Sequence, residues 1–143
     1  MGGRMGTKEN KELVRGFWEV AQKGDYDSFG NFITENSVDH TPMPGQPAGL
    51  EGVKYIFKML RSAFPDFSEE IVDMVAEDDK VVTRSISRGT HQGELMGLPP
   101  TGKKVQVDEI HIVWIKDGKM TDHWGLFDQA GMMAQLGMTP GGN

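Results

Sequence analysis

The chain has 143 residues, 37% of them hydrophobic and 25% charged, a composition typical of one folded domain rather than a disordered chain. The net charge of −6 disfavours a nucleic-acid-binding role, because phosphate binding requires a clustered face of Lys and Arg. The absence of cysteine excludes disulfides, thiolate nucleophiles and cysteine-ligated metal sites. No apolar run approaches the ~20 residues of a membrane helix, and we expect a cytoplasmic protein.

Helical periodicity dominates the first half of the chain. Apolar residues recur at helical spacing over Thr7–Lys23, and Gly24 is placed to end this helix. A second, short helix is expected to carry four apolar residues, Tyr26, Phe29, Phe32 and Ile33. Ser37–His40 reads as a brief strand before a Pro/Gly-rich loop, and a third helix begins at Leu50 and stops before Pro65.

The second half changes to a strand-like pattern, rich in Val, Ile and Thr. The predicted strands are Ile71–Ala76, Val81–Thr90, Lys104–Ile115 and Met120–Trp124. Asp117-Gly118 predicts a tight hairpin, and Asp128 is placed to cap a short C-terminal helix.

Helices followed by hairpins predict an α+β fold, with helices gathered on one face of a curved antiparallel sheet. We expect one domain over residues 7–137. Residues 1–6 are expected to be a flexible or expression-derived tail, and residues 138–143 a C-terminal tail.

The second half of the chain carries several motifs in a set order and spacing. The motifs are Gly89–Gly93, Met96–Lys103, Glu109–His111 with Trp114, Asp117–Met120, Asp122–Trp124, Asp128 and Gln135–Gly137. Their order and spacing resemble the SnoaL-like branch of the nuclear transport factor 2 superfamily, which includes polyketide cyclases that close rings by aldol chemistry. The resemblance covers nearly the full chain.

The resemblance implies a cone, in which the sheet wraps around the helices and encloses a deep, mostly apolar pocket for a small molecule. It also implies a homodimer and chemistry without cofactor or metal. The chain itself has no His-x-His or His-Glu-x-x-His pair to suggest a metal site.

One position departs from the cyclase pattern. The catalytic aspartate that moves the proton in the cyclases corresponds to Gly125, which has no side chain for this role. The pocket histidine of the cyclases corresponds to His111, and a glutamine two residues before it is replaced by Glu109. The glycine therefore argues against cyclase chemistry by the family's route.

Glu109 and His111 are the first candidates for acid/base chemistry. Residues two apart on a strand share a face and lie roughly 6 to 7 Å apart along it, near enough to share a substrate or a bridging water. The competing interpretation is a buried pair that only satisfies its own hydrogen bonds.

The remaining histidines supply further candidates. Ketosteroid isomerases, in the same superfamily, carry their general base on the strand that corresponds to Asp39 and His40, so His40 is a second candidate base. His91 and His123 are candidate donors to substrate, although His91 can equally hold a bend and Asp39 and His40 can be plain turn residues. Further substrate contacts are expected from three aromatic residues, Trp18, Phe57 and Trp114.

Three functions remain open. The first is a cofactor-free acid/base enzyme of isomerase or cyclase type acting on a mostly apolar carbonyl compound. The second is a non-catalytic binding or assembly domain, which the glycine at position 125 favours. The third is epoxide or ester hydrolysis, which calls for Asp/Arg pairing in the pocket, whereas Arg84 and Arg88 are expected to face outward.

Overall fold

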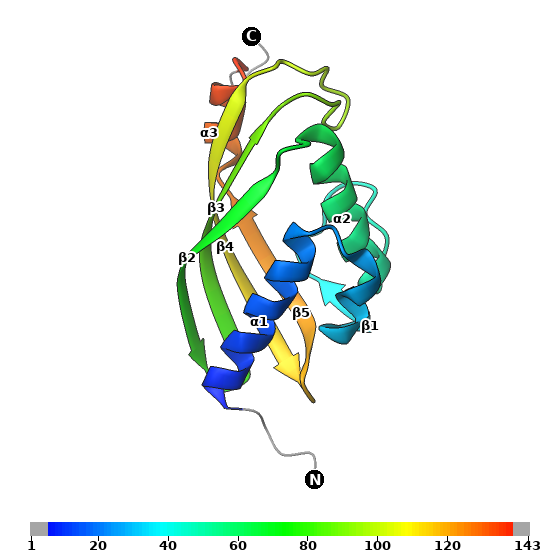
Figure 1. Cartoon of the computed structure of the whole chain (residues 1–143), viewed down its shortest axis with the longest axis vertical. Helices are drawn as coiled ribbons and strands as arrows, with labels where there is room; N and C mark the ends of the chain where they lie inside the picture. The colour runs from blue at the N-terminus through cyan, green and yellow to red at the C-terminus, as the bar shows by residue number, and fades with distance from the viewer. Residues whose placement is uncertain (1–5, 139–143) are drawn as a thin grey trace.

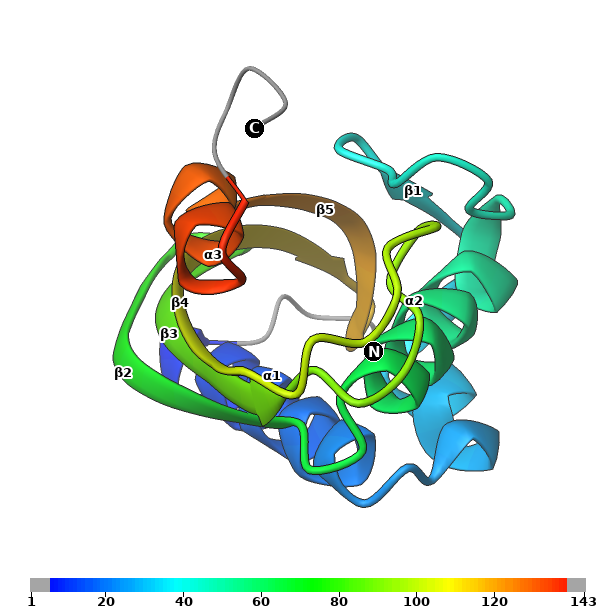
Figure 2. The same ribbon diagram turned by 90° about the horizontal axis from the view of Figure 1, so that it is seen from above.

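The computed structural model describes residues 6–138 and confirms the α+β class (Figure 1). A five-stranded sheet has the order β1-β5-β4-β3-β2, with β1 parallel to β5 and the other neighbours antiparallel. Seen from above, the sheet curls into an arc that α1 and α2 close from the concave side (Figure 2). In chain order the elements are α1 (Thr7–Gln22), the 3-10 helix η1 (Tyr26–Asn31), β1 (Ile33–Asp39), α2 (Gly49–Ala63), β2 (Ser68–Glu77), β3 (Lys80–Thr90), β4 (Lys104–Lys116), β5 (Lys119–Phe127) and α3 (Gln129–Gln135).

The first and third predicted helices and the predicted strands are confirmed, but the segment between α1 and α2 differs. Only Tyr26–Asn31 is helical, as one short 3-10 segment, and Ile33 already opens β1. The expected strand at Ser37–His40 is therefore too short. Glu35 and Asn36 have weak strand propensity, and the parallel pairing with β5, which joins Ile33 to Met120, supplies the order that they lack.

The predicted turn and cap are confirmed. Asp117 and Gly118 both adopt positive φ, at 51° and 78°, which matches the turn of a tight β4–β5 hairpin. The Asp128 carboxylate accepts a hydrogen bond from the Gly131 N–H at 2.9 Å and so caps α3. The predicted tails over residues 1–5 and 139–143 lie outside the described residues.

The core consists of two apolar clusters at opposite ends of the inner sheet face. One cluster, with Val105 and Val107, packs under α3, and the other, with Val113 and Ile115, packs against α1. Glu109 and His111 lie between them on the same inward face of β4. The apolar residues on either side thus fix this strand and hold its two polar side chains in the middle of the fold.

The outer face of the sheet is partly apolar. Ile110 on β4 is 53% exposed, and Leu126, opposite it on β5, is 74% exposed. The expected homodimer stays a prediction. Within residues 6–138, none of the helices is long and apolar enough to span a membrane.

Candidate active site

A cavity of about 290 Å³ opens between the two helices and the concave sheet face. Its wall is apolar where α1 and α2 face it, with Phe17, Trp18, Ile56, Phe57 and Leu60 among the lining residues. Its polar side chains come mainly from β1, β2, β4 and β5. A cavity that is mostly apolar with a few converging polar groups is the usual form of a small-molecule site.

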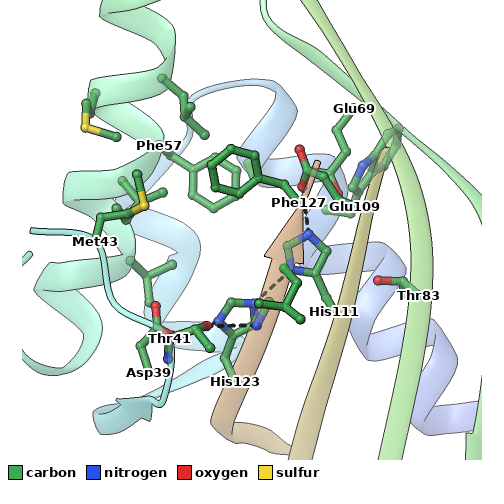
Figure 3. A pocket seen from close by; sticks show the side chains of 18 of the residues that line it. Asp39, Thr41, Met43, Phe57, Glu69, Thr83, Glu109, His111, His123 and Phe127 are labelled. Atoms are coloured by element: carbon green, nitrogen blue, oxygen red, sulfur yellow. Dashed lines mark hydrogen bonds and ion pairs between the residues drawn. The ribbon is translucent and has the colours of Figure 1, made fainter. Parts of the chain in front are cut away.

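Four titratable side chains form a continuous hydrogen-bonded chain in this cavity (Figure 3). Asp39 Oδ1 contacts His123 Nδ1 at 3.1 Å, and His123 Nε2 contacts His111 Nδ1 at 2.9 Å. His111 Nε2 contacts Glu109 Oε1 at 2.8 Å. We refer to Asp39, His123, His111 and Glu109 as the carboxylate–histidine chain. The second carboxylate oxygen of Glu109, Oε2, accepts a hydrogen bond from the Ser87 hydroxyl at 2.5 Å.

The carboxylate–histidine chain needs one proton more than its neutral imidazoles supply. Three hydrogen bonds link the four side chains, whereas two ionised carboxylates and two neutral imidazoles carry only two protons. If Asp39 is ionised, His123 donates to it from Nδ1 and accepts from His111 at Nε2. The additional proton therefore lies between His111 Nε2 and Glu109, at the cavity end of the chain.

The electrostatics agree with this placement. Burial alone lowers the pKa of His111, but the hydrogen bond to Glu109 and the charges of nearby carboxylates, Glu109 and Asp39 among them, outweigh it and raise this pKa above 6.5. Burial alone raises the pKa of Asp39. Hydrogen bonds from His123, Gln46 and the backbone N–H of Thr41 reverse that effect and hold the Asp39 pKa well below 3.8. His111 is thus favoured as an imidazolium and Asp39 as an anion.

Gly125 makes the contact between the two histidines possible. A Cβ at position 125 would lie 2.7 Å from His111 Nδ1 and 2.9 Å from His123 Nε2, closer than a carbon atom approaches these nitrogens. The backbone N–H of Gly125 donates to the Thr41 hydroxyl at 2.8 Å, which ties β5 to the end of β1. The imidazoles of His111 and His123 therefore occupy the space that a side chain at position 125 would fill.

The sequence reasoning missed Glu69, which lines the cavity from β2. Burial, followed by repulsion from Glu109, raises its pKa above 4.5. The missed signal is the inward alternation of β2, since Glu69 and Ile71 share a face, but the predicted strand began only at Ile71. Ser87, which donates to Glu109, was missed because a serine within a strand has no distinguishing pattern.

Two of the predicted site histidines lie outside the cavity lining. His40 stacks on Trp124 with ring centroids 3.9 Å apart and pairs with Asp122 at 2.8 Å. His91 is fully buried and contacts Thr101 at 3.1 Å, where it holds the loop before β4.

Two of the three aromatic residues expected to contact the substrate line the cavity, and the third does not. Phe57 and Trp18 line the cavity, and the Trp18 indole N–H is buried without a hydrogen-bond partner in the described part of the chain. Trp114, in contrast, is 40% exposed on the outer face, where its ring meets that of Trp124 at 4.8 Å.

The arginines needed for hydrolase chemistry face outward, as expected. Arg84 pairs with Asp73 at 2.8 Å, and Arg88 pairs with Glu70 at 3.1 Å, with side chains that are 48% and 44% exposed. The hydrolase alternative therefore gains no support from the site.

Three side chains offer atoms of the kind that bind a metal. One atom each of Glu69, Glu109 and His111 lies within 4.8 Å of the others. Two carboxylates and one imidazole suit a divalent cation in principle, yet in this geometry His111 Nε2 is already engaged with Glu109. A site without metal stays a prediction.

Comparison with known proteins places the chain in a family. The family model for SnoaL-like polyketide cyclases matches residues 11–136, which is most of the chain. The chain belongs to the SnoaL-like polyketide cyclase family.

Characterised and solved relatives of this SnoaL-like protein match over most of its length. It is 36% identical to the aklanonic acid methyl ester cyclase AcmA of Streptomyces galilaeus, over 90% of this chain and 91% of the relative. It is 29% identical to the aklanonic acid methyl ester cyclase DnrD of Streptomyces peucetius, over 88% of this chain and 89% of the relative. The structure of TsrD from Streptomyces laurentii superposes with a TM-score of 0.84 at 28% identity, covering 93% of this chain and 98% of TsrD.

Proposed function

We propose that the protein is a cofactor-free acid/base enzyme of cyclase or isomerase type, acting on a small, mostly apolar carbonyl compound held in the cavity. The observation that supports this most is a hydrogen-bonded carboxylate–histidine chain that ends inside an otherwise apolar cavity. A desolvated carboxylate beside an imidazole is an arrangement suited to moving protons at neutral pH. The cyclase activity of relatives such as AcmA supports the same reaction class.

In this proposal Glu109 is the base that removes a proton from carbon next to a carbonyl group. His111 donates to Glu109 and thereby sets the position of its carboxylate. Asp39 and His123 hold the His111 ring and stabilise its positive charge. Neither His40 nor His91 has a role in the proposed reaction, because neither side chain lines the cavity.

The aromatic wall would bind the body of the substrate. Phe57 and Phe17 pack edge to face at 5.8 Å and form a rigid apolar surface beside Trp18. The unpartnered indole N–H of Trp18 is a donor that a polar group of the ligand can satisfy. This combination favours a flat or polycyclic compound with few polar groups.

The alternative is a non-catalytic binding domain, which one observation favours. Each ring nitrogen of His111 and His123 already contacts another side chain of the carboxylate–histidine chain, so the chain can exist for structure alone. The glycine at position 125 removes the carboxylate that cyclases use there.

The experiment that separates the two is proton exchange followed by product analysis. Wild type and Glu109→Gln are incubated in D2O with aklanonic acid methyl ester and with a panel of polyketides, steroids, terpenoid epoxides and aromatic acids. A binding screen by thermal shift precedes the assay. The proposal expects wild type to exchange an α-proton and to convert at least one carbonyl compound, while Glu109→Gln binds it without exchange. Binding without exchange in either protein would establish the binding-domain alternative.

A further inference from the structure

Glu69 is the carboxyl group of the cavity that takes no part in the hydrogen bonds described so far. Four acidic residues, Asp39, Glu69, Glu109 and Asp122, line the cavity. Asp39 and Glu109 end the carboxylate–histidine chain, and Asp122 pairs with His40. Glu69 approaches the site from β2, at the opposite edge of the sheet from β1, with a carboxylate oxygen within 4.8 Å of atoms of Glu109 and His111 (Figure 3).

We propose that Glu69 is the general acid of this site, a protonated carboxyl that gives its proton to the carbonyl oxygen of the substrate while Glu109 takes the proton from carbon. The inference rests on the proposed acid/base function and names the group that completes it. Gly125 cannot fill that role because it has no side chain. The structure also leaves no room for one, since a Cβ at position 125 would lie 2.7 Å from His111 Nδ1.

The surroundings of Glu69 favour its protonated form. β4 presents the Glu109 carboxylate and the His111 ring, and α1 presents Arg15 and Glu19 along the shallow groove beside Glu69. Burial and the nearby Glu109 charge raise the Glu69 pKa by more than the charge of His111 and an interaction with the Ser85 hydroxyl on β3 lower it. Glu69 thus favours its neutral form within 4.8 Å of the Glu109 carboxylate, and neighbouring carboxyl groups in unlike environments can divide the roles of acid and base.

The two carboxyls balance an intramolecular aldol reaction without a co-reactant. In the first step the C–H bond next to the carbonyl breaks, Glu109 accepts that proton, and Glu69 protonates the carbonyl oxygen to give an enol. In the second step the enol carbon forms a bond to a second carbonyl carbon, whose oxygen takes the proton from Glu109. The enol O–H returns its proton to Glu69. Both side chains are thereby restored. In an isomerisation, Glu109 instead gives its proton to a different carbon of the enol, and the enol O–H returns its proton to Glu69, so both side chains are again restored.

The kinetic test compares Glu69→Gln and Glu69→Asp with Glu70→Gln, a matched control one residue along β2. Glu70 is 58% exposed and pairs with Arg88 on the outer surface. We expect Glu69→Gln to lower kcat for α-proton exchange by about 10²-fold or more with little change in KM. In wild type, activity should fall at alkaline pH as the Glu69 carboxyl group loses its proton. This fall should be absent from the pH profile of Glu69→Gln. Glu69→Asp should recover part of the rate, and Glu70→Gln should match wild type. Unchanged kcat and pH profile in Glu69→Gln would overturn the inference.

A second measurement does not depend on turnover. The carboxyl carbons of ¹³C-labelled glutamate are titrated by NMR with and without 1-hydroxyanthraquinone, and the Glu69 signal is assigned by its loss in Glu69→Gln. We expect Glu69 to keep its proton to higher pH than Glu70 and its signal to shift when the carbonyl probe binds. If wild type turns over nothing but these shifts are seen, the proposed function fails while Glu69 stands as a hydrogen-bond donor to a ligand carbonyl. A Glu69 signal that titrates like that of Glu70 and ignores the probe contradicts the inference itself.

Discussion

His111 and His123 contact each other ring to ring, at 2.9 Å between Nδ1 and Nε2, across the space that a side chain at position 125 would fill. The contact between the two histidines therefore depends on the glycine at position 125. Through this contact the Asp39 carboxylate acts on His111 and hence on Glu109, although Asp39 lies on β1 and Glu109 on β4.

Adding a side chain at position 125 tests this relationship. Gly125→Ala should break the contact between the two imidazoles and lower the free energy of unfolding by about 1–3 kcal/mol, because the two rings must move apart. Urea denaturation measures the change. Gly30→Ala is the control, since a Cβ there meets only Leu50 at an ordinary 3.5 Å. Equal stability of both variants would mean that the histidine pair tolerates a side chain.

Asp39→Asn tests whether the anion at the far end of the chain matters to the chemistry. An amide can present its NH2 group to His123 Nδ1 and so favour the wrong tautomer of that ring. We expect kcat to fall by about 10²-fold with KM little changed, because Asp39 positions His111 without touching the substrate.

His40→Gln is the matching control for Asp39→Asn. His40 stacks on Trp124 outside the cavity lining, so its loss should leave turnover close to that of wild type. A large loss of turnover would instead restore His40 as the base that the sequence suggested.

The stability of the fold should depend on the protonation of His111. Its pKa in the folded state lies above the ordinary value of 6.5, so its protonation stabilises the fold fully below pH 6.5. That contribution is lost as the pH rises through the raised pKa. Asp39 acts in the opposite sense, because its depressed pKa gives a stabilisation that is present above pH 3.8 and lost as the pH falls below it.

Unfolding free energies of wild type and His111→Gln, measured from pH 5 to pH 9, check the contribution of His111. The stability advantage of wild type over the variant should shrink as the pH rises above 6.5. An advantage that stays constant over this range would show that His111 does not carry the additional proton of the chain.

The charge of the cavity predicts which ligands it accepts. Asp39, Glu69 and Glu109 line the wall, while the Arg88 guanidinium is directed to the exposed Glu70. The His111 imidazolium is already paired with Glu109, so a ligand carboxylate would be buried without a cation of its own, and a methyl ester should bind at least about tenfold more tightly than its free acid. Calorimetry on aklanonic acid methyl ester and the free acid measures the difference. Tighter binding of the acid would contradict this view of the cavity.

The sequence predicts the fold well because its signals are periodic. Alternation along β4 places Glu109 and His111 on the inward face between two runs of valine and isoleucine, and the structure has them there. The resemblance to SnoaL-like proteins also identifies Gly125 as the point of departure, although it does not say what fills the space.

The remaining features of the site depend on contacts between strands that are distant in sequence. The pairing of Asp39 with His123 spans 84 residues, and it follows from the parallel register of β1 and β5. Glu69 was missed because it lies two residues before the predicted start of its strand, on an edge where propensity is weak. His40 was favoured by its strand, but one residue beyond the end of β1 its ring turns to the outer face and stacks on Trp124.

The central claim is that Glu109 is the base, and α-proton exchange in D2O tests it most directly. With a carbonyl compound that thermal shift shows to bind both proteins equally, wild type should exchange the proton next to the carbonyl. Glu109→Gln, which keeps the shape and loses the basic oxygen, should exchange at least about 10²-fold more slowly. Exchange at the same rate in both proteins would contradict the account, because the proton would then be removed by a group other than Glu109.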